Sequence, residues 1–196
     1  MQPPAAPSGF DPYPPDLATC RRCPRLAEFR EEVARVKRRA YRDQEYWGAP
    51  VPGFGDPDAS LLVVGLAPGA HGSNRTGRMF TGDASGTFLY AAMHRLGLAN
   101  QPTAVSRDDG LRLNGVWITA SARCVPPGNK PTTLELATCR HWLEHDFDGL
   151  RSVKAILALG RIGHDSTVKL YRDRGLQVTL AAVPFAHGAV HRLDQL

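Results

Sequence analysis

The sequence has little that would carry the chain into a membrane or out of the cell. No apolar run is long enough to cross a bilayer. Residues 1–16 are rich in proline and lack the apolar segment of a secretory signal. Cysteine is also scarce, with four in 196 residues. We therefore expect a cytoplasmic protein without a membrane partner, whose reduced cysteines bind a metal or fill the core rather than form disulfides.

Several common ligand-binding motifs are missing as well. No Gly-Lys-Ser or Gly-Lys-Thr occurs, and the glycines after the first apolar segment fit neither the P-loop nor the dinucleotide-binding fingerprint. The Cys-x-x-Cys at residues 20–23 has no second copy to complete a zinc ribbon. These absences argue against P-loop, dinucleotide-binding and zinc-ribbon proteins.

What is present predicts an α/β domain. The length suits one domain, 19–196, after a disordered proline-rich tail, 1–18. Apolar segments predict strands at 61–65, 116–122 and 154–160 and a β-like run at 177–183, and helical patterns fall at 23–42, 85–96, 132–145 and 162–174. Strands that alternate with helices predict a mainly parallel, doubly wound sheet, whose ligands sit beyond the carboxyl ends of the strands.

The most informative segment is 61–86, LLVVGLAPGAHGSNRTGRMFTGDASG. An apolar strand runs into a loop rich in glycine, which lets the backbone approach a ligand closely. Phe80 is the one large aromatic residue of the loop and Asp83 its one carboxylate. A stacking ring, a backbone cradle and a lone acid suit a planar base held beside an activated water. The alternative is an ordinary glycine-rich loop between strand and helix, which either binds phosphate or has no ligand.

Positive charge is concentrated near the amino end. The chain carries a net charge of +5. Segment 21–42 alone holds nine basic residues against three acidic ones, an excess of six. Such a segment suits the phosphate backbone of a nucleic acid. A solvated helix face is the alternative explanation.

The cysteines are Cys20, Cys23, Cys124 and Cys139. The first two have a spacing at which both thiolates can reach one metal centre. Cys124 lies at the end of a predicted strand, and Cys139 lies on the predicted helix that follows. All four thiolates can therefore converge on one metal centre. We favour an iron–sulfur cluster over zinc because irregular spacing is common around clusters. Unrelated buried cysteines remain a third possibility.

Asn129 lies in a second candidate segment, ARCVPPGNKP at 122–131, which follows the second predicted strand. Its amide can read the donor–acceptor edge of a pyrimidine or hold a water. Asn is also favoured in turns for purely structural reasons.

Together these residues resemble the family 5 (type B) uracil-DNA glycosylases, the iron–sulfur members of the uracil-DNA glycosylase superfamily. The resemblance covers about 19–187. It rests on CRRCPRL (20–26), PVPGFGDPD (50–58), GLAPGAHGSNRTGRMFTGDASG (65–86), TASARCVPPGNKP (119–131), Cys139, ALGRI (158–162) and FAHGA (185–189). Leu66 points to type B, because a sister family usually has an acidic residue there.

The resemblance implies a three-layer α/β/α fold with a central parallel sheet of four strands. It implies hydrolytic removal of a damaged base from DNA, typically uracil and in some cases other deaminated bases, in base-excision repair. Because no lysine occupies the loop 65–86, we expect a monofunctional glycosylase, and nothing in the sequence suggests more than a monomer. It also implies a structural [4Fe–4S] cluster on the four cysteines. The residues carried over are Asp83 and Asn129 as catalytic groups, and Gly65, Ala67, Gly69, Phe80 and His187 as base-binding groups.

The chain departs from the family pattern at its carboxyl end. The superfamily usually continues with a last strand and a His-Pro-Ser loop, and no His-Pro occurs here. We therefore expect a carboxyl-terminally truncated domain. This leaves open a catalytically impaired iron–sulfur fragment that only binds DNA. A zinc-stabilised nucleotide-binding protein outside the superfamily is a third hypothesis.

Overall fold

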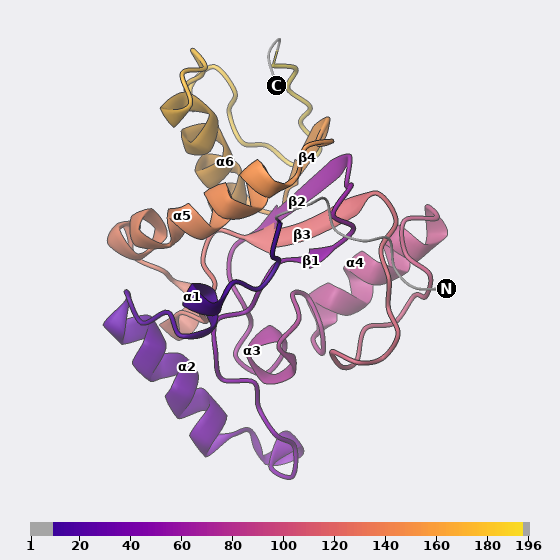
Figure 1. Cartoon of the computed structure of the whole chain (residues 1–196), viewed down its shortest axis with the longest axis vertical. Coiled ribbons are helices and arrows are strands. Elements are labelled where there is room, and N and C mark those ends of the chain that lie inside the picture. Colours follow the sequence, from indigo (N-terminus) through magenta and orange to yellow (C-terminus); the bar gives the residue numbers. More distant parts are fainter. Residues whose placement is uncertain (1–9, 194–196) are drawn as a thin grey trace.

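The fold is built on a four-stranded sheet with helices on both faces (Figure 1). The computed structural model describes residues 10–193. The strands are β1 (Phe54–Gly55), β2 (Leu61–Gly65), β3 (Val116–Ala120) and β4 (Ala155–Ala158), in the order β1-β3-β2-β4. β2 is parallel to both β3 and β4, and β1 is antiparallel to β3.

Six helices accompany the strands in the described part of the chain. They are α1 (Pro15–Ala18), α2 (Pro24–Val36), α3 (Ser73–Thr76), α4 (Ala84–Arg95), α5 (Thr133–Gly149) and α6 (Arg161–Asp173). Two 3₁₀ turns lie at Arg39–Tyr41 and Pro127–Asn129. The predicted capping box before α5 is present, with Thr132 and Glu135 each bonding the other's backbone N–H. Among these helices none is long and apolar enough to span a bilayer.

Alternate residues of the strands feed two cores, one on each side of the sheet. On one side, Val63 and Ile118 pack with Tyr90 of α4. On the other side, Leu62 and Trp117 pack with residues from α5 and α6, among them Leu143 and Leu170. Burying one such aliphatic side chain stabilises the fold by about 1.5–3 kcal/mol. The predicted α/β/α layering with a mostly parallel sheet is thereby confirmed.

One prediction about strands is wrong, and one strand was not predicted. β1 lies within a segment without a strand pattern and pairs antiparallel with β3, beside the three parallel strands. Segment 177–183 forms no strand. Its chain folds back at Thr179, whose hydroxyl accepts from the N–H of Ala182, and Val178 and Val183 pack on α6 instead of on a neighbouring strand.

The amino-terminal predictions also need correction. The helix predicted for 23–42 ends at Val36, because Lys37 takes a left-handed φ of 59°. The disorder predicted for 1–18 is wrong from residue 10 onward, since α1 forms there and Leu17 is 1% exposed. The ring of Phe10 packs edge-on against Trp117, 5.2 Å between centroids. Residues 1–9 lie outside the described residues.

A buried ion pair joins the loop after β2 to the loop before β3. Nη1 and Nη2 of Arg78 lie 2.8 and 2.7 Å from the carboxylate oxygens of Asp109, and the two side chains are 3% and 7% exposed. Asp109 also accepts from the N–H groups of Val105 and Leu111. Burial by itself raises the pKa of Asp109, but the hydrogen bond from Arg78 and those from the backbone outweigh it and hold the pKa well below its usual range.

We expect Asp109→Ala to lower the free energy of unfolding by about 3–5 kcal/mol, because it leaves Arg78 buried without a counter-charge. A carboxyl with a lowered folded-state pKa stabilises the fold above its unfolded pKa of about 3.9, and this is lost as pH falls toward the folded value. Urea unfolding from pH 7 down to pH 3 should therefore show a weaker acid destabilisation in the variant. Asp108→Ala, at an exposed position, is the control. If wild type, Asp109→Ala and Asp108→Ala lost the same stability in acid, Asp109 would not be the group whose lowered pKa stabilises the fold.

Candidate active site

The three candidate segments meet at one edge of the sheet. Because β2, β3 and β4 are parallel, their carboxyl ends share that edge. The loop 66–83 leaves β2, segment 121–132 leaves β3, and α6 begins shortly after β4. The strand order places the glycine-rich loop between the other two segments, at the edge where the sequence predicts that ligands bind.

Phe80 and Gly65 form a flat wall at the start of this loop. The ring of Phe80 lies so close to Gly65 that a Cβ there would be 2.8 Å from Cζ. Phe80 has a left-handed φ of 52°, which is uncommon for an aromatic residue and marks a conformation enforced by its surroundings. Part of that enforcement comes from Gly86, where a Cβ would overlap the Phe80 carbonyl. The half-buried ring of Phe80 is thus fixed against the backbone of Gly65, which has no side chain.

Asp83 uses its two carboxylate oxygens differently. It is the N-cap of α4, and Oδ1 accepts from the N–H of Gly86 at 3.0 Å. Oδ2 faces the loop backbone: a Cβ on Gly69 would be 3.1 Å away, and one on Gly72 would overlap it. No hydrogen bond to Oδ2 is formed by residues 10–193. One oxygen thus holds the helix while the other is available to a water or ligand.

Other predicted site residues lie around this centre. Ala67 packs in a small core with Ala122, Cys139 and Trp142. Asn129 is exposed, with a left-handed φ of 57°, in the 3₁₀ turn Pro127–Asn129.

His187 is exposed, with its ring 5.6 Å from that of Phe185. The structure brings Gly65, Gly69, Phe80 and Asp83 together. Within the described residues, no hydrogen bond links His187 or the Asn129 side chain to them.

Arg75 supports the loop, and sequence patterns did not identify it. Its Nε donates to the carbonyl of His71 at 2.7 Å, and its Nη2 donates to that of Gly82 at 3.3 Å. A Cβ on Gly82 would overlap the guanidinium. Sequence patterns also did not identify Gly72, whose lack of a side chain leaves room for the carboxylate of Asp83, eleven positions away. No periodic pattern in a sequence indicates such a contact.

Gly72→Ala tests whether the position of the Asp83 carboxylate matters. The added methyl group takes the space of Oδ2, so we expect it to lower the rate of the uracil excision that the family resemblance implies, although no chemical group is removed. Gly69→Ala, which meets the same atom at 3.1 Å, should have a smaller effect. Single-turnover rates, with thermal unfolding as the control for folding, measure both. A larger loss in Gly69→Ala than in Gly72→Ala would contradict this geometry.

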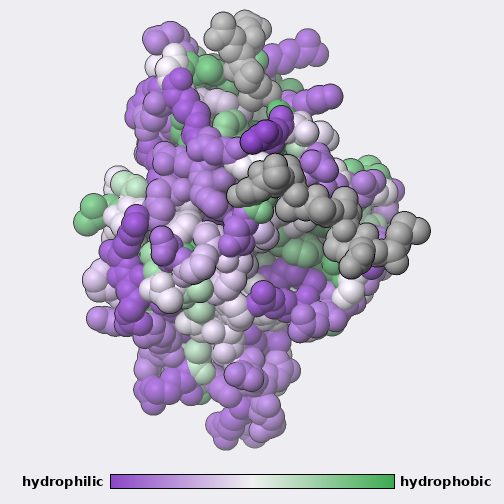
Figure 2. Space-filling model, in the orientation of Figure 1, coloured by the Kyte–Doolittle hydropathy of each residue, from purple (hydrophilic) through white to green (hydrophobic). Residues whose placement is uncertain are grey.

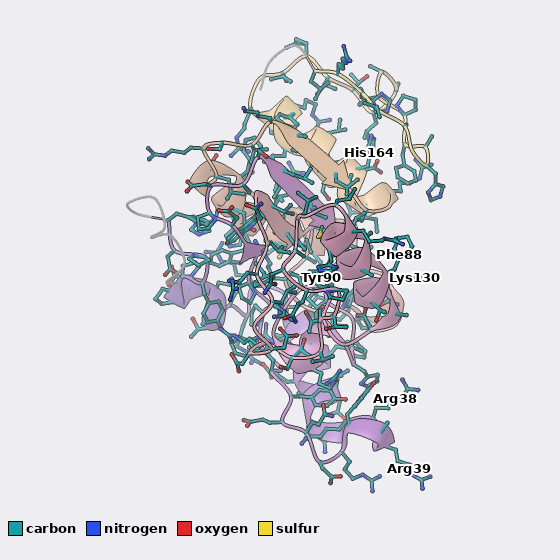
Figure 3. All side chains as sticks on the ribbon, turned by 90° about the vertical axis from the view of Figure 1, so that its right-hand side faces the viewer. Arg38, Arg39, Phe88, Tyr90, Lys130 and His164 are labelled. Carbon is teal, nitrogen blue, oxygen red and sulfur yellow. The ribbon has the colours of Figure 1, made fainter. Side chains whose placement is uncertain are left out.

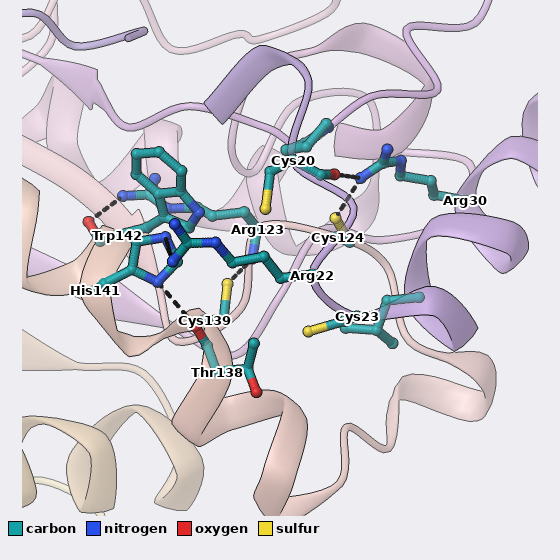
Figure 4. Close-up of a pocket in the computed structure, with 12 residues that line it drawn as sticks. Cys20, Arg22, Cys23, Arg30, Arg123, Cys124, Thr138, Cys139, His141 and Trp142 are labelled. Atoms are coloured by element: carbon teal, nitrogen blue, oxygen red, sulfur yellow. Dashed lines mark hydrogen bonds between the residues drawn. The ribbon is translucent and has the colours of Figure 1, made fainter. Parts of the chain in front are cut away.

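A second candidate site lies where the four cysteines line one cavity (Figure 4). Cys20 and Cys23 precede α2, Cys124 follows β3, and Cys139 lies on α5. All four are free thiols, and their sulfurs surround a common space. Across residues 10–193, no three His, Cys, Asp or Glu side chains are grouped tightly enough to hold a single metal ion.

Two arginines donate hydrogen bonds to the sulfurs. Nη1 of the buried Arg30 lies 2.9 Å from Sγ of Cys124, and the backbone N–H of Arg123 lies 3.2 Å from Sγ of Cys139. Burial raises the pKa of Cys139 to about 12 and also raises that of Cys124, while the neighbouring arginines act in the opposite direction. The cavity therefore combines buried thiols with donors that stabilise thiolates.

The chain is similar to uracil-DNA glycosylases over most of its length. The family model for the uracil DNA glycosylase superfamily matches residues 52–191. A type-5 uracil-DNA glycosylase of Mycobacterium leprae is 52% identical over 90% of this chain and 76% of its own length. One of Thermus thermophilus is 52% identical over 90% and 78%. One of Pyrobaculum aerophilum is 45% identical over 92% and 76%.

Proposed function

Since the chain belongs to the uracil-DNA glycosylase superfamily, we propose that it hydrolyses the N-glycosidic bond of uracil in DNA and so begins base-excision repair. The observation that carries the proposal is the free Oδ2 of Asp83, which faces the glycine backbone of the loop that also holds Phe80. An acid, a fixed aromatic ring and close backbone are what base hydrolysis needs in one place.

The proposed mechanism begins with base extrusion, because the glycosidic carbon cannot be reached inside a duplex. The flipped uracil stacks on Phe80, and the backbone of residues 65–69 forms the pocket wall. Asp83 Oδ2 accepts a proton of the attacking water and orients it. The same carboxylate stabilises the positive charge that develops on the sugar as the base departs. Asn129 assists in the pocket, and His187 supports the base.

The enzyme is proposed to be monofunctional. No lysine lies in the loop 65–86 to act as an amine nucleophile on the sugar. Water is then the nucleophile, and an intact abasic site is the product. We propose that the protein acts as a monomer in the cytoplasm, where its four free thiols stay reduced.

Cys20, Cys23, Cys124 and Cys139 are proposed to hold a [4Fe–4S] cluster. The fit rests on four free thiols around one cavity and on two donors aimed at sulfur. Within the described residues, no three metal-binding side chains lie close enough together to hold a single ion. A cluster of several irons spans more space than one ion and so suits thiols at this wider separation. The cluster would serve as a structural crosslink between α2, the segment after β3 and α5, and no step of base removal passes through it.

The proposal is tested with a duplex oligonucleotide that carries one uracil opposite guanine and with anaerobically purified protein. We expect release of free uracil and strand cleavage only after alkali. Borohydride should trap no covalent protein–DNA adduct. A folded protein that binds DNA but releases no uracil would contradict the proposed activity, and a trapped adduct would contradict the hydrolytic mechanism.

A further inference from the structure

A short basic turn follows α2 at residues 37–42, here called the basic turn. Arg38, Arg39 and Arg42 are exposed in it. Arg35, one turn earlier, is paired with Glu32, and the Lys37 ammonium donates to backbone carbonyls. The three exposed guanidinium groups form no ion pair within residues 10–193. Their charge is therefore available to an external anion.

The basic turn is fixed to the glycine-rich loop through Tyr46. The Tyr46 hydroxyl accepts from the backbone N–H of Arg38 at 3.3 Å and lies 3.1 Å from Nδ1 of His71, which belongs to the loop. Tyr46 is 8% exposed, so this link is shielded from water. Burial lowers the pKa of His71, and the charges of Arg38 and Arg75 lower it further, which agrees with their proximity.

Arg75 makes a second connection. Its guanidinium lies 4.1 Å from the centroid of the Tyr41 ring in the basic turn and donates to Oε1 of Gln44 at 2.6 Å. The same side chain holds the carbonyls of His71 and Gly82 in the loop. Gly82 directly precedes Asp83. Arg75 thus holds the basic turn to the glycine-rich loop, as Tyr46 also does.

The surroundings of the basic turn suit a charged partner. The turn lies at the lower end of the molecule in Figure 1, and Figure 2 shows that end as hydrophilic. In Figure 3, Arg38 and Arg39 lie on the same side of the view as Lys130, which follows β3 next to Asn129. Asp43 and Glu45 are exposed just after the turn, but the exposed arginines outnumber them.

We propose that Arg38 and Arg39 of the basic turn bind backbone phosphates of DNA beside the extruded nucleotide, an inference that rests on the proposed function. Arginine forms strong, often bidentate hydrogen bonds to phosphate. Phosphate contacts fix a protein's register on DNA and carry no sequence information. A contact here sets the strand against the loop that carries Phe80 and Asp83, because Tyr46 and Arg75 hold turn and loop together.

The test measures the affinity for an undamaged duplex at several salt concentrations by fluorescence anisotropy. The variant is the double substitution Arg38→Gln and Arg39→Gln. Each phosphate contact adds about 0.9 to the slope of log K against log salt, so we expect the slope to fall by about 2 and the affinity at low salt to drop several-fold. Both side chains are exposed and unpaired with described residues, so folding should be unaffected.

The control is the double substitution Arg151→Gln and Lys154→Gln, which removes the same charge from exposed positions before β4, at the opposite edge of the sheet. It should keep the wild-type slope. A wild-type slope in the Arg38 and Arg39 variant, or an equal loss in the control, would overturn the proposal. Because this duplex contains no uracil, the measured affinity does not depend on excision. If wild-type protein failed to release uracil in the excision assay, only the proposed function would be contradicted.

Discussion

Replacing Asp83 by Asn should lower the single-turnover rate of uracil excision by about 10²–10⁴-fold, the usual contribution of a general acid–base group. Asn keeps a side-chain oxygen for the N–H of Gly86, and Asn caps helices as well as Asp does. The free energy of unfolding should therefore be almost unchanged. Asn cannot take a proton from water or balance positive charge on the sugar, so the loss falls on the chemical step.

Asp108→Asn is the matched control, because it makes the same charge change at an exposed position of the loop before β3. It should leave the excision rate at the wild-type value. Asp83→Ala adds a second comparison: it should lose activity to a similar extent and also about 1 kcal/mol of stability through the lost cap. Wild-type rates in Asp83→Asn would remove Asp83 from the catalytic step.

The second large effect is expected at the cysteine cavity. Cys139→Ala should reduce iron and acid-labile sulfide to a small fraction of the wild-type content. Loss of a bound metal centre belongs to the changes that cost more than about 4 kcal/mol. In a domain of this size that corresponds to a fall in Tm of about 8–16 °C. The expected loss of stability is large because Cys139 is buried on α5, and the proposed cluster would connect α5 to α2 and to the segment after β3.

Thr138→Ala is the control for this experiment, since Thr138 lines the same cavity from the neighbouring position of α5 and has no thiol. It should keep full iron and sulfide content. Metal analysis, visible absorption and thermal unfolding measure the outcome without reference to activity. A wild-type protein that contains stoichiometric zinc without iron would contradict the cluster, and a fully loaded Cys139→Ala would exclude Cys139 as a ligand.

Local patterns predicted the parts of the fold that depend on neighbouring residues. The apolar run 61–65 is β2, and the capping box Thr132–Glu135 begins α5. Strand and helix alternation also predicted the edge at which the loop 66–83 lies. These features follow from hydrophobic burial and helix capping, which are visible within a few residues of sequence.

The features that sequence patterns missed depend on contacts between distant residues. Phe10 packs on Trp117, more than a hundred positions away, so composition alone misread the segment 10–18 as disordered. The fit of the Asp83 carboxylate against Gly72 depends on the path of the loop in space. Arg75 was invisible for the same reason, because its partners lie in two separate segments.

We propose that the loop 65–86 is the base pocket and that Asp83 acts within it. A crystal structure of the Asp83→Asn variant with a duplex that contains uracil tests this directly. We expect an extruded uracil stacked on Phe80, against the backbone of residues 65–69, with its glycosidic bond beside position 83. An extruded uracil bound elsewhere, with the Phe80 ring and the loop free of DNA, would contradict it.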